Sequence, residues 1–311
     1  MKLYPYALPL ATPLRFAGQS LDQRHGLLIK LERDGHTGWG DCAPLPGFSH
    51  ESLAQCQSAL QALAAGQIDE ATLPPAAHFA LDCARWQCEG PRRLNLPASI
   101  PLLVGTPEQQ LAQFDALTTP PGEVKLKLAR APMEQEIALV YALLERQPKL
   151  LLRIDANRGW SAEQASHFAA SVPPAALRYV EEPCANLNDS LRVAAQHRLP
   201  LALDETTQVA DYQYESLPGV RALVLKPTLI GSLARLQQLV QQARLDGVEV
   251  VLSSSFESNI GLTHLAHLAA ELTPDSVPGL DTLAPLGADL LEANPWGLAK
   301  PVITESELTP L

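Results

Sequence analysis

The chain has 311 residues, of which 46% are hydrophobic and 18% charged, and its formal net charge is −11. This length allows one large domain or two unequal ones, and the acidic balance argues against nucleic acid or an anionic membrane as a partner. The sequence holds no apolar run long enough to span a membrane and no apolar signal-peptide region at its start. The five cysteines form no CxxC pair, so we expect reduced, mostly buried thiols in a cytoplasmic protein.

The first 97 residues predict an α+β domain. Three strands and then two helices are expected there, at residues 3–10, 26–33 and 37–41 and at residues 51–65 and 75–88. Between the first two strands, the polar, glycine-containing stretch 14–24 has no regular pattern, and we expect a loop. The C-terminal segment 288–311 is short and is expected to pack back on this domain.

After residue 97, short apolar runs recur, each followed by a helical stretch. Successive runs end 22 to 28 residues apart, counted by subtraction between the residues at or near their ends, which are Val104, Lys127, Asp155, Glu181, Asp204, Lys226, Ser253 and Asp281. A strand and helix repeated eight times with such a period is typical of a (β/α) barrel. We therefore expect an α/β barrel domain over residues 98–287.

Two lysines stand two residues apart in the second run, and side chains at such positions on a strand point the same way. Lys125 and Lys127 would then share one buried face. Repulsion between two ammonium groups and loss of hydration both lower a lysine pKa, so that one of them could act as a base near neutral pH. The alternative is an edge strand with two solvated lysines.

Carboxylates end the next three runs. Active sites of barrels form at the carboxyl ends of the strands, which would bring Asp155, Glu181 and Asp204 together. Three carboxylates that close cannot all stay ionised without a cation, and all-oxygen ligation favours Mg²⁺ first and Mn²⁺ second. With Lys226 on the sixth run, this layout suits removal of a proton next to a carboxylate. The alternative is that each acid caps the helix after its strand.

These residues resemble the enolase superfamily, and within it the muconate-lactonizing-enzyme subgroup and the o-succinylbenzoate synthases of the proteobacterial type. The motifs that carry the resemblance lie between residues 38 and 283. They are G-W-G-D at 38–41, P-L-P-G-F-S at 44–49, K-x-K at 125–127, R-I-D-A-N at 153–157, E-E-P-C at 181–184, L-D-E at 203–205, L-K-P-T at 225–228, S-S-S-F-E-S at 253–258 and P-G-L-D-T-L at 278–283. The resemblance implies a modified (β/α)8-type barrel, (β/α)7β, with an N-terminal α+β capping domain, in a monomer.

The resemblance also implies a reaction. It is the Mg²⁺-dependent syn-dehydration of 2-succinyl-6-hydroxy-2,4-cyclohexadiene-1-carboxylate to 2-succinylbenzoate, a hydro-lyase step of menaquinone biosynthesis. Lys127 matches the base that takes the α-proton, and Lys226 matches the lysine that stabilises the enediolate together with the metal. The metal ligands would be Asp155, Glu181 and Asp204, and residues expected to meet the small-molecule carboxylate substrate are Lys125, Arg153, Ser253 and Ser254. For Arg153 a structural ion pair inside the barrel is the alternative, and stretch 14–24 matches a mobile loop that closes over the site.

Rival functions differ at particular strand ends. No histidine stands at a strand end, which removes the mandelate-racemase type. An N-acylamino acid racemase or dipeptide epimerase of the same subgroup would use the same two lysines, but dipeptide epimerases carry D-x-D where Gly279-Leu280-Asp281 stands here. A catalytically silent barrel that binds a partner would be marked by loss of a lysine or a metal ligand. His264 and His267, on a helical stretch, are interpreted as surface or packing residues.

Overall fold

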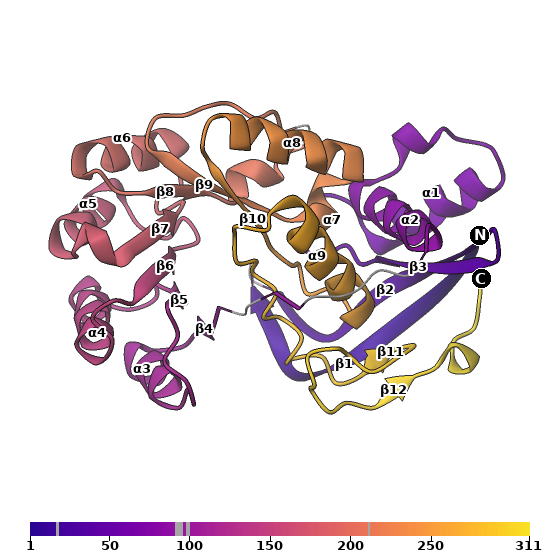
Figure 1. The fold of residues 1–311 in the computed structure, drawn as a ribbon, viewed down its shortest axis with the longest axis horizontal. Coiled ribbons are helices and arrows are strands. Elements are labelled where there is room, and N and C mark those ends of the chain that lie inside the picture. The colour runs from indigo at the N-terminus through magenta and orange to yellow at the C-terminus, as the bar shows by residue number, and fades with distance from the viewer. Residues whose placement is uncertain (17–18, 91–95, 98–99, 211) are drawn as a thin grey trace. The chain divides into compact units, whose positions relative to one another are not determined.

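The computed structural model describes residues 1–16, 19–90, 96–97, 100–210 and 212–311 (Figure 1). The chain forms two compact units that interleave along the sequence. We call them the cap unit (Met1–Ala98, Lys226–Val240 and Leu252–Leu311) and the sheet unit (Ser99–Leu225 and Gln241–Val251). The predicted domain boundaries, after residues 97 and 287, stay a prediction.

The sheet unit is built on parallel strands. Among the described residues, seven strands form one sheet in the order β10-β9-β8-β7-β6-β5-β4, so that neighbours in sequence are neighbours in the sheet. The strands are β4 (Leu102–Leu103), β5 (Glu123–Lys127), β6 (Leu151–Asp155), β7 (Leu177–Glu181), β8 (Leu201–Leu203), β9 (Val220–Leu225) and β10 (Glu249–Leu252). The predicted α/β barrel-type architecture is confirmed. Parallel strands end at one edge, so residues that close the runs meet there.

The eighth predicted strand is reduced to a short contact. Within the described residues, stretch 277–281 makes one isolated parallel bridge, between Ser253 and Gly279. The N–H of Gly279 donates to the carbonyl of Leu252, and the N–H of Ser254 donates to the carbonyl of Gly279. Proline at 278 lacks an N–H for a regular ladder, which explains why the stretch pairs at a single residue.

Helices separate the strands of the sheet and lie along one side of β4 to β8 (Figure 1). They are α3 (Pro107–Asp115), α4 (Met133–Arg146), α5 (Ala162–Ser171) and α6 (Leu187–His197), with single turns at η2 (Pro174–Ala176) and η3 (Glu205–Gln208). Ser161 caps α5 and Asn186 caps α6 through their side chains, and Asp204, before η3, makes no capping hydrogen bond. The three acids are therefore not helix caps, and that alternative is excluded.

The cap unit carries an antiparallel sheet covered by helices. Its elements are β1 (Lys2–Phe16), β2 (Gln19–Arg33), β3 (His36–Cys42), α1 (Leu53–Ala64), η1 (Glu70–Thr72), α2 (Pro75–Cys88), α7 (Pro227–Ile230), α9 (Asn259–Leu272), β11 (Asp289–Leu290), β12 (Val302–Ile303) and η4 (Glu305–Glu307). Helix α8 (Leu233–Leu245) begins in this unit. Helix α2 packs directly on β3, because a Cβ built at Gly38 or Gly40 would lie within 1.9 Å of a backbone carbonyl of α2.

The expected loop at 14–24 is wrong where the structure describes it. Strands β1 and β2 are paired antiparallel along their backbones, with position 14 opposite 21 and position 16 opposite 19, after a register shift between Pro9 and Leu14. The polar, glycine-containing sequence here shows no apolar alternation, so the pattern gave no strand signal. Residues 17 and 18 lie outside the described residues, and closure of this stretch over a site stays a prediction.

The thiols agree with what the cysteine spacing indicated. All five cysteines, at positions 42, 56, 83, 88 and 184, are free and buried, as expected. None of the helices in the described part of the chain is both long and apolar enough to cross a membrane.

Candidate active site

The carboxyl ends of β5, β6 and β7 bring two lysines and two carboxylates into contact. Lys127 is paired with Asp155 across the β5–β6 ladder, and Asp155 with Glu181 across the next. The Lys125 Nζ lies 2.7 Å from a Glu181 oxygen and 3.0 Å from Asp155 Oδ2, and the Lys127 Nζ lies 2.5 Å from Asp155 Oδ2. The predicted shared face is confirmed. The edge-strand alternative is excluded, because β5 lies between β4 and β6.

Charge balance around Lys125 differs from the prediction. Burial opposes its ammonium form, but the carboxylates of Asp155, Glu181 and Asp204 outweigh burial and hold the pKa of Lys125 well above its usual value. The expectation that two neighbouring lysines lower each other's pKa is therefore wrong for Lys125. Sequence spacing places the lysines together, but the carboxylates of Asp155 and Glu181 come from other strands and lie within 3.0 Å of the Lys125 Nζ.

The two carboxylates of the cluster are held in opposite directions. Burial would raise the pKa of Asp155, but Lys125 and Lys127 overcome it and hold that pKa far below its usual value. Burial raises the pKa of Glu181 to about 8 in spite of Lys125, and the charges of Asp155 and Asp204 add to the rise. A cation placed at this site would favour the ionised form of Glu181, because nearby positive charge lowers the pKa of a carboxyl group.

The carboxylate oxygens of the three acids suit a hard divalent cation, of which Mg²⁺ is the first choice. A single ammonium nitrogen, on Lys125, already lies within 3.0 Å of both Asp155 and Glu181, so one cation can bridge them. Asp204 directly follows β8, and its Oδ1 accepts a hydrogen bond from Gln208 Nε2 at 2.8 Å. All three acids offer oxygen, the ligand that Mg²⁺ prefers.

The three carboxylates are not gathered to ligand distance in this structure. Within the described ranges, the group of three whose ligand atoms lie within 4.8 Å of one another is Glu70, His78 and Asp82 in the cap unit. There Arg85 forms ion pairs with both acids, with its Nη2 at 2.6 Å from Glu70 and its Nη1 at 3.8 Å from Asp82. The magnesium set of the sheet unit stays a prediction, supported by its donor chemistry.

Arg153 is engaged within the sheet. It is 3% exposed, its Nε donates to Glu123 Oε2 at 2.9 Å, and its guanidinium lies 5.3 Å from the ring centre of Tyr179. Of the two roles considered for Arg153, the structural ion pair is the one seen here. Contact with a substrate carboxylate stays a prediction.

The remaining predicted site residues belong to the cap unit. Lys226 directly follows β9, is 8% exposed, and places its Nζ 5.9 Å from the ring centre of Phe48. The Ser253 hydroxyl donates to the carbonyl of Gly279 at 3.3 Å, and the hydroxyls of Ser254 and Thr282 are 2.5 Å apart. Their predicted roles toward substrate are not tested by these contacts.

Sequence reasoning missed a contact of the predicted base. Asn157 accepts a hydrogen bond from Lys127 Nζ at 2.9 Å, and its N–H donates to Asp155 Oδ1 at 3.0 Å. Its φ of 45° lies in the left-handed region that occurs in turns. Its place in R-I-D-A-N, directly after a strand end, was the available signal. Sequence reasoning also gave no role to Glu182, which directly follows a predicted ligand and is buried.

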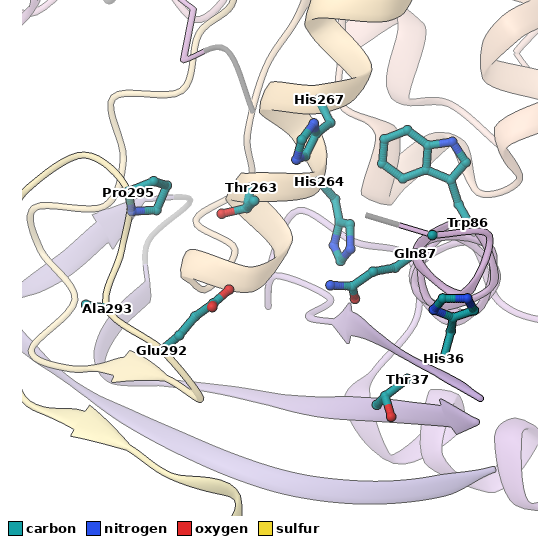
Figure 2. A pocket seen from close by; sticks show the side chains of 11 residues that line it. His36, Thr37, Trp86, Gln87, Thr263, His264, His267, Glu292, Ala293 and Pro295 are labelled. Carbon is teal, nitrogen blue, oxygen red and sulfur yellow. The ribbon is translucent and has the colours of Figure 1, made fainter. Parts of the chain in front are cut away.

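A separate cavity in the cap unit holds none of the predicted site residues (Figure 2). Its volume is about 680 Å³, and its lining includes His36, Trp86, His264, His267 and Glu292. His264 is 4% exposed and meets Trp86 edge-on, with ring centres 6.4 Å apart. Burial, with a smaller contribution from His267, lowers the pKa of His264 to about 4. The packing interpretation of His264 is confirmed.

Comparison with known proteins covers both parts of the chain. Residues 1–88 match the family described as "MenC, N-terminal domain", and residues 108–296 match "Enolase C-terminal domain-like". An o-succinylbenzoate synthase of Yersinia pseudotuberculosis is 43% identical over 98% of this chain and 97% of its own length.

Solved structures agree on the fold. An o-succinylbenzoate synthase from Thermosynechococcus elongatus, solved with Mg in its active site, is 26% identical with a TM-score of 0.72, covering 91% of each chain. The L-Ala-D/L-Glu epimerase of Bacillus subtilis is 21% identical with a TM-score of 0.75, covering 92% of this chain and 90% of its own. The second likeness shows the fold alone. Sequence and fold together show that the chain belongs to the o-succinylbenzoate synthase family of the enolase superfamily, as its motifs predicted.

Proposed function

We propose that this chain is a hydro-lyase that converts 2-succinyl-6-hydroxy-2,4-cyclohexadiene-1-carboxylate to 2-succinylbenzoate in menaquinone biosynthesis, with Mg²⁺ as cofactor. The observation that carries the proposal is the 43% identity over 98% of the chain to a protein named o-succinylbenzoate synthase. The contact of Lys125 and Lys127 with Asp155 and Glu181 supports it, because proton removal next to a carboxylate needs a base and positive charge side by side.

The side-chain amine of Lys127 would take the α-proton, leaving the electron pair in an enediolate. The C–O bond to the ring hydroxyl then breaks on the same face, and the hydroxyl leaves as water with the proton that Lys127 carries. Lys226, as an ammonium, would stabilise the enediolate, and Asn157 orients Lys127 through its 2.9 Å hydrogen bond. Mg²⁺ held by Asp155, Glu181 and Asp204 would supply positive charge beside the substrate carboxylate.

The ring becomes aromatic in this step, so product formation is downhill and the enzyme mainly lowers the barrier to proton removal. Each factor of ten in rate corresponds to about 1.4 kcal/mol of that barrier. Electrostatic stabilisation of the developing charge is usually the largest contribution in such sites. We therefore expect the lysines and carboxylates of the sheet unit to contribute most of the rate acceleration.

The direct test follows the loss of the diene absorbance of the substrate. With Mg²⁺, purified protein should consume it; a chelator should stop the reaction, and added Mg²⁺ should restore it. Mn²⁺ is expected to substitute. The assignment is wrong if turnover is undetectable while an N-succinylamino acid is racemised briskly under the same conditions.

A second candidate is an N-acylamino acid racemase or dipeptide epimerase of the same subgroup. It is kept because solved epimerases resemble this chain in fold as closely as the solved synthase does, with TM-scores of 0.75 and 0.72. Gly279-Leu280-Asp281 lacks the first acid expected in a dipeptide epimerase, which favours the dehydration. Racemase assays with N-succinylamino acids, run beside the diene assay, separate the two.

We also propose that the protein works as a monomer in the cytoplasm, with a small-molecule carboxylate as its partner and neither nucleic acid nor membrane. Five free, buried thiols suit a reducing compartment. Light scattering of the purified protein should give a mass near that of one chain, and a stable dimer would contradict the proposal.

A further inference from the structure

The carboxylate of Glu182 joins three loops at the carboxyl edge of the parallel sheet. It is 1% exposed and directly follows β7. Its Oε1 accepts from the backbone N–H groups of Asp204 at 2.9 Å and of Thr206 at 2.6 Å. Its Oε2 accepts from Arg158 Nε at 2.7 Å and from the Thr206 hydroxyl at 3.0 Å. One side chain thus ties together the loops that follow β6, β7 and β8.

The backbone in these loops is held in an unfavourable conformation. Asn157, Arg158 and Glu182 have φ values of 45°, 59° and 23°, in the left-handed region that side-chain-bearing residues rarely adopt. Such conformations cost free energy and persist where the surroundings fix them, most often at functional sites. The hydrogen bonds and ion pair of Glu182 provide that fixation, because they connect two of the three strained residues directly.

Each loop carries one of the predicted metal ligands. Asp155 lies three residues before Arg158, Glu181 is the covalent neighbour of Glu182, and the N–H of Asp204 is itself bound by Glu182. Glu181, the last residue of β7, contacts Lys125, whereas Glu182, in the turn that follows, contacts the loops after β6 and β8. The Glu-Glu doublet therefore divides two tasks between two carboxylates.

We propose that Glu182 is a positioning residue that sets the affinity of the Asp155–Glu181–Asp204 set for Mg²⁺. The inference rests on the metal set of the proposed function. Without the Glu182 carboxylate, the Asp204 N–H loses its acceptor and Arg158 its counter-ion, so that backbone hydrogen bonds alone hold the end of β8 and the turn after β6 to the end of β7. Groups that orient metal ligands in this indirect way typically contribute 10- to 100-fold in affinity.

The test compares two isosteric variants by titration calorimetry of the substrate-free protein with Mg²⁺. Glu182→Gln keeps the size of the side chain but puts an amide where Arg158 needs an acceptor. Glu249→Gln is the matched control, because Glu249 pairs with Arg178 at 2.7 Å in the same unit, at the amino-terminal ends of β10 and β7. We expect the Kd for Mg²⁺ to rise 10- to 100-fold in Glu182→Gln and to change less than twofold in Glu249→Gln.

The dependence of the rate on Mg²⁺ concentration distinguishes a role of Glu182 in metal affinity from a role in general stability. The rate of Glu182→Gln should return to within about fivefold of wild type when Mg²⁺ is saturating, since the loss lies in metal affinity. An unchanged Kd in Glu182→Gln, or equal losses in both variants, would overturn the inference. If Glu182→Gln does not fold, Arg158→Gln is measured in its place against the same expectation.

The same measurements test the proposed reaction independently of the role of Glu182. Wild-type protein that binds Mg²⁺ without dehydrating the diene would refute the proposed reaction, and the ratio of Kd values would still decide the role of Glu182. Wild-type protein that binds no Mg²⁺ at millimolar concentration would refute both.

Discussion

Buried charge is handled differently in the two units. In the sheet unit, Lys125 is paired through its side chain with Asp155 and Glu181. In the cap unit, Arg24 is 1% exposed and donates to backbone carbonyls, among them those of Pro44 and Phe256, each at 2.9 Å. A carbonyl is fixed by the chain, whereas a carboxylate can exchange one cation for another. Burial alone therefore does not identify a site; the kind of partner does.

The difference gives Arg24 an architectural role. Its guanidinium joins strand β2, the segment at residues 43–44 and the segment at residues 255–256 of the cap unit. Phe256, whose carbonyl it holds, has a φ of 58°. The lysines of β5 instead contact groups that substrate or metal would also seek. Variants of Arg24 and of the β5 lysines should accordingly change different properties, the first folding stability and the second reaction rate or metal affinity.

The largest effect is expected for Lys127→Ala. Removing the proposed base should lower turnover by at least about 1,000-fold, equivalent to about 4 kcal/mol in the barrier, with little change in the free energy of unfolding. Loss of diene absorbance and urea unfolding measure the two quantities. Lys149→Ala, at an exposed lysine of the same unit, is the control and should keep the wild-type rate. A near-normal rate in Lys127→Ala would remove Lys127 from its role.

Arg24→Met should act mainly on stability. The substitution keeps the length of the side chain but leaves several buried carbonyls without a donor, and we expect a loss of about 3 kcal/mol in the free energy of unfolding. Urea denaturation measures it. Arg33→Met, at a side chain 74% exposed and 3.5 Å from Asp34, should change that free energy by about 0.5 kcal/mol or less. A loss below about 1 kcal/mol for Arg24→Met would show that these carbonyls find other donors.

Lys125→Met tests whether the lysine partners of the carboxylates can be exchanged. Without the ammonium, Asp155 and Glu181 repel each other, so the protein without metal should be less stable. Mg²⁺ should then bind about tenfold more tightly, or by about 1.4 kcal/mol, because a competing positive charge is gone. The gain is limited because the Lys125 side chain is one-fifth exposed and solvent screens part of its charge. Calorimetry with Lys149→Met as control measures this. Weaker binding in Lys125→Met would mean that the lysine helps to assemble the metal set.

The strand-end charges could be predicted because they depend on spacing. A period of two puts Lys125 and Lys127 on one face, and parallel register puts Lys127 beside Asp155. The direction of the pKa shift of Lys125 could not be predicted, because it depends on the distances to carboxylates on other strands. Spacing indicates which groups meet, whereas the charge balance depends on how closely they meet.

The cap unit was predicted less completely. The paired strand residues 14–16 and 19–24 show no apolar alternation, so a periodicity argument did not detect them. The carbonyl partners of Arg24 come from residues up to 232 positions away, and backbone acceptors leave no mark in a sequence. Glu182 shows the same limit in the sheet unit, since its partners are N–H groups and an arginine of neighbouring loops.

The last prediction concerns His264, a buried base kept neutral. Burial lowers its pKa to about 4, and an unfolded histidine titrates near 6.5. Between these values the unfolded chain binds a proton that the folded chain does not, so stability is full above pH 6.5 and falls as pH falls toward 4. The loss in the free energy of unfolding due to His264 should be about 1.4 kcal/mol at pH 5.5.

His264→Phe keeps a ring against Trp86 and removes the titration. Urea unfolding at pH 7.5 and 5.5 should therefore show a smaller drop in the variant than in wild type. Equal drops would mean that His264 is protonated in the folded protein, and the cap unit would then hold an exchangeable charge like those of the sheet unit.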